Sequence, residues 1–185
     1  MILTYQQIRN SLGSMILNFS EESVRENGYD LRVCGDKYWR ILGGASLPEK
    51  KSEVEEFPFE EYADLEPGNT YLLESCEEVN MPNDVMGIMT LRSTMARNGF
   101  LAPPTVIDAG YKGKIIIALS TLRGGRIRRE FRVVHLIFAK LQEPTLKYIK
   151  PVIGRSTCET SKRQEDLPQT ARLFHYLTCI GQIGS

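Results

Sequence analysis

Two arginines and two hydroxyl side chains lie within six residues and have the chemistry to bind a phosphate group. Arg92, Ser93, Thr94 and Arg97 follow an apolar segment, and Gly99 ends a stretch that favours a short helix. Guanidinium groups form paired hydrogen bonds with phosphate oxygens, and hydroxyls and free N–H groups at a helix start add donors. A capped helix with solvated arginines has the same residues, so both interpretations stay open on spacing alone.

Asp108 lies where a carboxylate could act on a water molecule. Two prolines and a β-branched pair precede it, and Gly110 and Tyr111 follow, which indicates a stiff approach and then a turn. A carboxylate on such a loop could orient and deprotonate water beside a ligand that approaches the glycine. Aspartate is also a common turn former, so a plain hairpin explains the same residues.

The stretch 123–132 concentrates arginines around a Gly-Gly turn: Arg123, Arg126, Arg128, Arg129 and Arg132. It could be a phosphate-binding or nucleic-acid-binding surface, or a solvated hairpin tip. The formal net charge is zero, with 23 lysines and arginines against 23 aspartates and glutamates. This balance argues against nucleic-acid binding by bulk electrostatics and supports the solvated tip.

The composition is that of an ordinary globular protein. We expect the 185 residues to form one domain, and no apolar run approaches the ~20 residues of a membrane span. The start lacks a basic leader and a cleavage pattern, so a cytoplasmic protein without a membrane partner is expected. His135 and His175 lack ligand spacing, which argues against a structural zinc site, and Trp39 is expected in the core. Free thiols are expected for the four scattered cysteines, Cys34, Cys76, Cys158 and Cys179.

Short segments rich in Val, Ile, Leu and Tyr alternate with turn residues along most of the chain, which predicts a mostly β barrel or sandwich. The expected strands are 29–33, 37–42, 70–75, 84–91, 113–122 and 130–141. Thr4 and Gln7 have the spacing of a capping box, which predicts a first helix ending near Gly13. A closing helix is expected at 167–181, where apolar residues follow helical spacing. The acidic stretch 48–68 is interpreted as a surface excursion.

The order of four segments resembles the trimeric dUTPase and dCTP deaminase superfamily. They read NGYDLRV at 27–33, LRSTMARNGF at 91–100, VIDAGYKGKI at 106–115 and FRVVHLIFAKL at 131–141. The likeness covers roughly residues 16–141, and the central pair of motifs is specific. The stretches 19–33 and 65–75 are similar to the deaminase branch and to its archaeal and viral dUTPase relatives.

This resemblance implies a distorted β-barrel of the β-clip type, with a short N-terminal helix and a C-terminal helix. It also implies a homotrimer with three active sites between subunits. Tyr111 would lie against the deoxyribose, and main-chain groups of the hairpin around Gly113 would contact the pyrimidine. The residues that the resemblance assigns to the triphosphate are Arg92, Ser93, Thr94 and Arg97.

Magnesium is a further implication of the resemblance, bound mainly through phosphate oxygens and water. Asp30 would lie near the metal and triphosphate or support them. The tail 150–185 would form a lid and closing helix, with Lys162 and Gln164 as substrate-binding residues. The sequence departs from the family pattern in lacking the glycine-rich C-terminal arm of ordinary dUTPases. Val134 and His135 also replace the usual Gly-Gln of the fourth motif.

Ala118 separates the two activities of the superfamily. By resemblance, deamination of dCTP uses a glutamate ten residues after the motif aspartate, where this chain has an alanine that cannot transfer protons. Cleavage of dUTP needs a water in line with the α-phosphorus and a carboxylate that takes its proton. The sequence therefore predicts a dUTP diphosphatase with Asp108 as the base and Arg97 as its partner on the phosphate side.

Two alternatives stay open. A dCTP deaminase, alone or coupled to dUTP cleavage, needs a substitute for the missing glutamate, and no acid occurs between Lys112 and Glu130. A non-catalytic nucleotide-binding regulator on the same fold is kept open by the changes at Val134 and His135.

Overall fold

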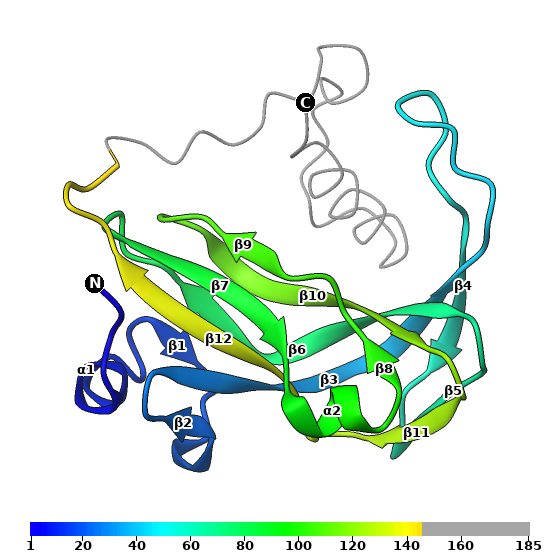
Figure 1. The fold of residues 1–185 in the computed structure, drawn as a ribbon, viewed down its shortest axis with the longest axis horizontal. Coiled ribbons are helices and arrows are strands. Elements are labelled where there is room, and N and C mark those ends of the chain that lie inside the picture. The colour runs from blue at the N-terminus through cyan, green and yellow to red at the C-terminus, as the bar shows by residue number, and fades with distance from the viewer. Residues whose placement is uncertain (146–185) are drawn as a thin grey trace. The chain divides into compact units, whose positions relative to one another are not determined.

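A computed structural model describes residues 1–145 as a mostly β protein with two short helices, which confirms the expected fold class (Figure 1). The expected lid and closing helix, with Lys162 and Gln164, lie outside these residues. The chain up to residue 80 contains α1 (Tyr5–Asn10), β1 (Ile16–Leu17), a 3-10 turn (Glu21–Ser23), β2 (Val24–Arg25), β3 (Gly28–Ile41), β4 (Val54–Pro58), β5 (Tyr62–Leu65) and β6 (Thr70–Asn80). The remainder contains β7 (Val85–Leu91), α2 (Ser93–Arg97), β8 (Phe100–Leu101), β9 (Thr105–Ile107), β10 (Lys112–Thr121), β11 (Gly125–Arg128) and β12 (Arg132–Lys140). Within residues 1–145, no helix is long and apolar enough to cross a membrane.

Ten strands form one curled antiparallel sheet, which wraps around the core as half a barrel (Figure 1). Its order is β8-β10-β6-β3-β12-β7-β9, with β1 beside β6 and with β2 and β4 beside β3, while β11 and β5 form a separate ribbon. Alternation in the strands supplies the core, because successive side chains point to opposite faces. In β10, for example, Ile115, Ile117 and Leu119 are buried, whereas Ile116 and Ala118 are half-buried on the other face.

β3 is one long strand where the sequence predicts two, at 29–33 and 37–42. Gly35 has φ +97° and lies within a register shift between Cys34 and Trp39. A glycine in an irregular position of this kind bends a strand without ending it. The break that the sequence indicates is therefore a bend, and β3 pairs along its length with four other strands.

The predictions that rest on residues close together in the sequence are confirmed. The Thr4 N–H donates to Gln7 Oε1 at 2.9 Å at the start of α1, as a capping box requires. The second short helix, α2, precedes Gly99, whose φ of +82° suits only a glycine-like turn. Trp39 is buried, as expected.

The acidic stretch 48–68 supplies two strands and is not only a surface excursion. β4 pairs with β3, with Glu56 opposite Trp39, and β5 pairs with β11. Phe59 and Leu65 from this stretch are buried in the core. The high acid content conceals these strands because the β4 carboxylates pair with cations on β3 and do not mark a loop.

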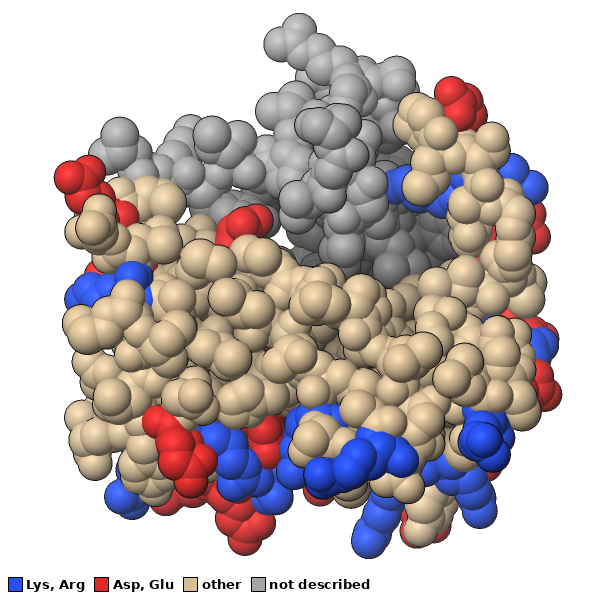
Figure 2. Space-filling model, in the orientation of Figure 1, with Lys and Arg blue, Asp and Glu red and all other residues tan. Residues whose placement is uncertain are grey.

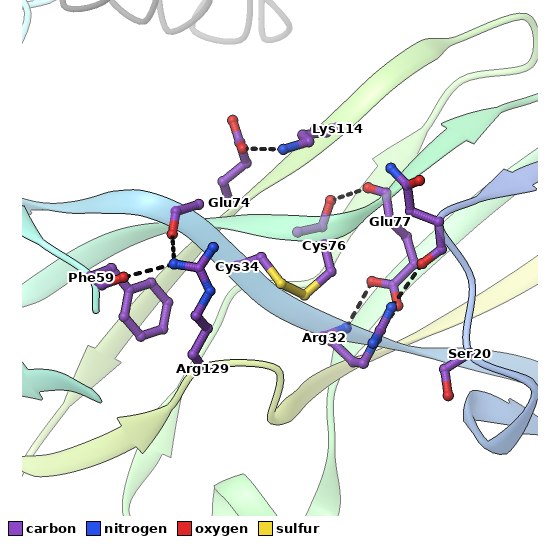
Figure 3. Close-up of a disulfide and its surroundings, with 12 residues drawn as sticks. Ser20, Arg32, Cys34, Phe59, Glu74, Cys76, Glu77, Lys114 and Arg129 are labelled. Carbon is purple, nitrogen blue, oxygen red and sulfur yellow. Dashed lines mark hydrogen bonds and ion pairs between the residues drawn. A yellow bond between two sulfur atoms is a disulfide. The ribbon is translucent and has the colours of Figure 1, made fainter. Parts of the chain in front are cut away.

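Cys34 and Cys76 form a disulfide, so the expectation of free thiols is wrong for these two residues (Figure 3). They are 42 residues apart in sequence, but they lie on the paired strands β3 and β6 with Cα atoms 4.6 Å apart. Only the sheet pairing brings them together. Cys158 and Cys179 lie outside the described residues.

Two arginines of the stretch 123–132 are half-buried and take part in the fold, and so depart from the expected solvated tip. Arg129 donates to two backbone carbonyls at 2.7 and 2.9 Å, and Arg132 donates to Ser23 Oγ at 3.2 Å and to Glu22 at 2.9 Å. Arg126 is exposed and pairs with the exposed Asp64 at 2.6 Å. Arg123 and Arg128 are exposed, as expected.

Candidate active site

A buried carboxylate, Asp30 on β3, gathers three nitrogen-bearing side chains where β7 ends. Its Oδ2 accepts a hydrogen bond from Arg25 Nε at 2.7 Å and lies 3.1 Å from Arg92 Nε. Its Oδ1 lies 2.9 Å from His135 Nδ1. The arrangement follows from sheet register, because His135 on β12 is opposite Asp30 on one side and Thr90 of β7 on the other. Asp30 thus contacts Arg92, the first of the residues predicted to bind the triphosphate.

The surroundings of Asp30 keep it ionised. Burial raises the pKa of Asp30, but hydrogen bonds from His135 and Arg25 and the charges of Arg92 and Arg25 outweigh it and lower the pKa below its usual value. At neutral pH the cluster therefore holds one carboxylate against two guanidinium groups. This leaves an excess of positive charge even when the imidazole is neutral.

The other predicted phosphate-binding residues follow Arg92 in α2. The side chains of Ser93, Thr94 and Arg97 are exposed, and Arg97 has no hydrogen bond or ion pair with any residue in 1–145. Arg92 differs because its Nη1 also donates to the Arg132 carbonyl at 2.9 Å. One fixed guanidinium and three exposed donor side chains therefore lie together at this end of β7, and this donor set suits phosphate oxygens.

Asp108 lies in the turn between β9 and β10 with its side chain exposed. Backbone hydrogen bonds of 2.8 and 3.2 Å tie this turn to the one between β6 and β7. Gly110 and Gly113 have φ of +82° and +142°, which leaves the backbone open to close approach. Tyr111 is half-buried, and its O–H donates to the Lys114 carbonyl at 2.7 Å, which orients the ring.

Asp108 and Arg92 lie at opposite ends of β7 and do not meet within one chain. The β7–β9 register puts Ile107 opposite Gly87, whereas Arg92 follows the far end of β7. Six strand residues at ~3.3 Å each separate the two by about 20 Å. Figure 1 shows the β9–β10 turn and α2 at opposite ends of β7. The structure thus brings Asp30 together with the predicted phosphate-binding residues and does not bring Asp108 to them.

A carboxylate that sequence reasoning missed lies beside Ala118. In the β10–β6 register Ala118 is opposite Leu72 and Ile116 is opposite Glu74, so Glu74 and Ala118 are diagonal neighbours on one face, offset by two residues. Glu74 Oε1 accepts from Lys114 Nζ at 2.6 Å (Figure 3). The sequence of β10 does not reveal this acid, because Glu74 belongs to β6 and only strand pairing places it near Ala118.

The described residues do not provide a protein site for magnesium. No group of three or more His, Cys, Asp or Glu side chains within 1–145 is placed to hold a metal ion. Asp30 is enclosed by cationic partners, which would repel a divalent cation. This chemistry fits only a magnesium ion that arrives with a nucleotide and keeps phosphate and water ligands.

Similarity to known proteins covers most of the chain. The model of the dCTP deaminase-like family matches residues 2–141. A protein of Korarchaeum cryptofilum (strain OPF8) named dCTP deaminase is 34% identical over 152 residues, which are 77% of this chain and 86% of that protein. A Sulfolobus islandicus rod-shaped virus 1 protein, named probable deoxyuridine 5'-triphosphate nucleotidohydrolase, is 34% identical over 80% of this chain and 89% of its own. The solved 2'-deoxycytidine 5'-triphosphate deaminase of Agrobacterium tumefaciens has the same fold, with TM-score 0.63 and 21% identity over 74% of this chain and 46% of that one.

Proposed function

The chain belongs to the dCTP deaminase-like family, and from this premise we propose that it cleaves dUTP to dUMP and pyrophosphate. The observation that carries the proposal is an intact Asp108 hairpin followed by alanine at position 118. The hairpin keeps an exposed carboxylate for water, while β10 carries no acid at the position where deamination would need one.

In the proposed reaction, Asp108 orients a water molecule and takes its proton as the water oxygen attacks the α-phosphorus. The bond from the α-phosphorus to the bridging oxygen breaks, and that oxygen leaves with pyrophosphate. Arg92, Ser93, Thr94 and Arg97 bind the phosphate oxygens, and Arg97 offsets charge that develops during the attack. Tyr111 packs against the deoxyribose. Magnesium bound through the phosphates and water would neutralise part of the triphosphate charge.

We further propose that each site combines the Asp108 hairpin of one copy with the Arg92 region of another, in a homotrimer. The separation of about 20 Å along β7 supports this, since one chain cannot present both groups to one α-phosphorus. A row of apolar side chains across three strands supports association: Val106 and Ile88 are opposite each other and 56% and 37% exposed, and Ile88 is opposite Ile137. Figure 2 shows few charged side chains over this part of β7, β9 and β12.

The decisive experiment offers dUTP and dCTP separately to the purified protein and follows pyrophosphate and ammonia. We expect pyrophosphate from dUTP, and its loss in Asp108→Asn with retained binding of a non-hydrolysable dUTP analogue. The matched control is Asp84→Asn, which removes a carboxylate from the adjoining β6–β7 turn, where it pairs with Lys140 at 3.4 Å. Hydrolysis by Asp108→Asn would refute the assignment of the base.

Subunit mixing tests the shared site. Asp108→Asn and Arg92→Ala should each be inactive alone, and co-assembled trimers should regain activity, because some sites then combine two unaltered halves. Mixtures that stay inactive, although both variants are trimeric, would contradict the shared site.

A second candidate function is deamination of dCTP, which the names of several relatives and the position of Glu74 favour. Water would add to C4 of cytosine, Glu74 would move its proton to the leaving amine, and ammonia would be released. Ammonia from dCTP that disappears in Glu74→Gln would establish this candidate over dUTP cleavage.

A further inference from the structure

Arg92 is held at two points and keeps donors to spare. Its Nε lies 3.1 Å from Asp30 Oδ2 and its Nη1 donates to the Arg132 carbonyl at 2.9 Å. A guanidinium carries five N–H donors, and no residue in 1–145 accepts a hydrogen bond from Nη2. The group therefore has a fixed plane and an unoccupied edge.

The charges around Asp30 are arranged with the anion inside and the cations outside. The Asp30 side chain is 3% exposed, whereas those of Arg25 and Arg92 are 32% and 24% exposed. The carboxylate fixes these cations without consuming all their donors. A phosphate group is the class of ligand that suits such an edge, because its oxygens accept from a guanidinium in parallel.

His135 completes the shell of Asp30. Both carboxylate oxygens are in use, with His135 Nδ1 at 2.9 Å from Oδ1 and both arginines on Oδ2. Since a carboxylate only accepts, Nδ1 carries the proton. Without the imidazole, the carboxylate could rotate about its bond, and Arg92 would lose its fixed direction.

Gly28 provides the space that this imidazole occupies. A Cβ atom at position 28 would lie 2.4 Å from His135 Nε2 and 2.7 Å from the Leu136 carbonyl oxygen. The ring thus lies directly over the backbone at the start of β3, which only glycine permits. The position of the His135 ring therefore depends on glycine at 28, which the Leu136 carbonyl also requires.

We propose that His135 is a positioning residue for Arg92, acting through Asp30, and that Gly28 makes room for its ring. The phosphate that Arg92 receives is that of the nucleotide, so this inference rests on the proposed function. His135 touches no reacting atom and acts by aiming the guanidinium.

The test compares His135→Leu with the rescue variant His135→Gln, whose side-chain amide can still donate to Asp30. The control is Thr90→Val, which alters the residue opposite His135 on β7, whose side chain makes no hydrogen bond to the cluster within residues 1–145. For dUTP, KM should rise about tenfold in His135→Leu and recover in His135→Gln, with kcat changed less. Gly28→Ala should displace the ring and raise KM in the same direction, while also crowding the Leu136 carbonyl. His135→Ala provides the test if His135→Leu does not fold.

A readout independent of turnover is the 15N resonance of the Arg92 Nε–H group. The proton on this nitrogen should exchange slowly with water in the unaltered protein, His135→Gln and Thr90→Val. It should exchange rapidly in His135→Leu and Asp30→Asn. An unchanged resonance and an unchanged KM in both His135→Leu and Gly28→Ala would overturn the inference. If the unaltered protein neither binds nor cleaves dUTP, the proposed function fails, while the resonance still decides whether His135 fixes Arg92.

Discussion

Asp30 and Glu77 are both buried carboxylates on neighbouring strands, but they differ in how many N–H donors their arginine partners keep free. Glu77 is fully buried and receives hydrogen bonds from Arg32 Nε at 2.7 Å and the Arg32 backbone N–H at 3.0 Å (Figure 3). The Tyr29 hydroxyl also donates to it, at 3.1 Å. Arg32 Nη2 also donates to the Asn18 carbonyl at 2.7 Å, so two of its nitrogens are already bound within the chain. Asp30 has two arginines that remain partly exposed.

From this difference we infer a structural role for Glu77 and a role in ligand binding for Asp30. Arg32 balances the charge of Glu77, and the two side chains make hydrogen bonds to each other and to nearby backbone groups. Asp30 has two guanidinium partners for its single negative charge, and the excess positive charge faces solvent. We therefore expect changes at Glu77 to affect folding and changes at Asp30 to affect phosphate binding.

The largest expected effect is on stability, in Glu77→Gln. Removing this charge leaves the half-buried Arg32 beside a neutral amide in the core, so the free energy of unfolding should fall by about 3 kcal/mol. Denaturant unfolding measures the loss. Asp30→Asn is the comparison and should lose less, because its two arginines can turn towards water, and it should raise KM more. The reverse order for either quantity would remove the distinction between the two carboxylates.

Reduction of the Cys34–Cys76 disulfide should have the next largest effect. This bond joins β3 to β6, the strands that carry the two carboxylates, and closes a separation of 42 residues. Its loss should lower the free energy of unfolding by about 3 kcal/mol through greater freedom of the unfolded chain. Unfolding with and without reductant measures this, and Cys34→Ser/Cys76→Ser should be insensitive to reductant. A change in KM larger than the change in stability would link the disulfide to the site instead.

The smallest expected effect is an alkaline loss of stability from the Glu77 cluster. Burial and the negative charge of Glu77 raise the pKa of Tyr29 to about 12. An unfolded tyrosine titrates near 10, so the folded state holds this proton more tightly. The contribution is complete below about pH 10 and is lost as pH rises towards 12, at up to about 1.4 kcal/mol per pH unit.

Unfolding measured from pH 9 to 12 tests this prediction. Tyr29→Phe should flatten the decline, whereas Asp30→Asn should leave it unchanged, because the pKa of Asp30 is lowered and its contribution is lost only in acid. An equally steep decline in Tyr29→Phe would assign the alkaline loss to another group.

Local patterns in the sequence determined much of the fold. The capping box at Thr4, the glycine stop at Gly99 and the alternation along β10 and β12 were readable because their partners lie within a few residues. The acidic stretch 48–68 was misread because carboxylates that pair across strands look the same in sequence as carboxylates in a loop. The order of the four motifs identified the family, because the order is specific even though each motif alone has a second explanation.

The tertiary structure decided which residues meet. Asp30 and His135 are 105 positions apart, Arg32 and Glu77 are 45, and register alone places each pair in contact. Conversely, Arg92 and Asp108 are close in sequence, and the extended β7 keeps them about 20 Å apart. Strand pairing acts over any sequence separation, and a rigid strand prevents near neighbours from meeting. The sequence therefore determined the residue types and the fold, while the sheet determined which charges support one another and which lie too far apart to meet within one chain.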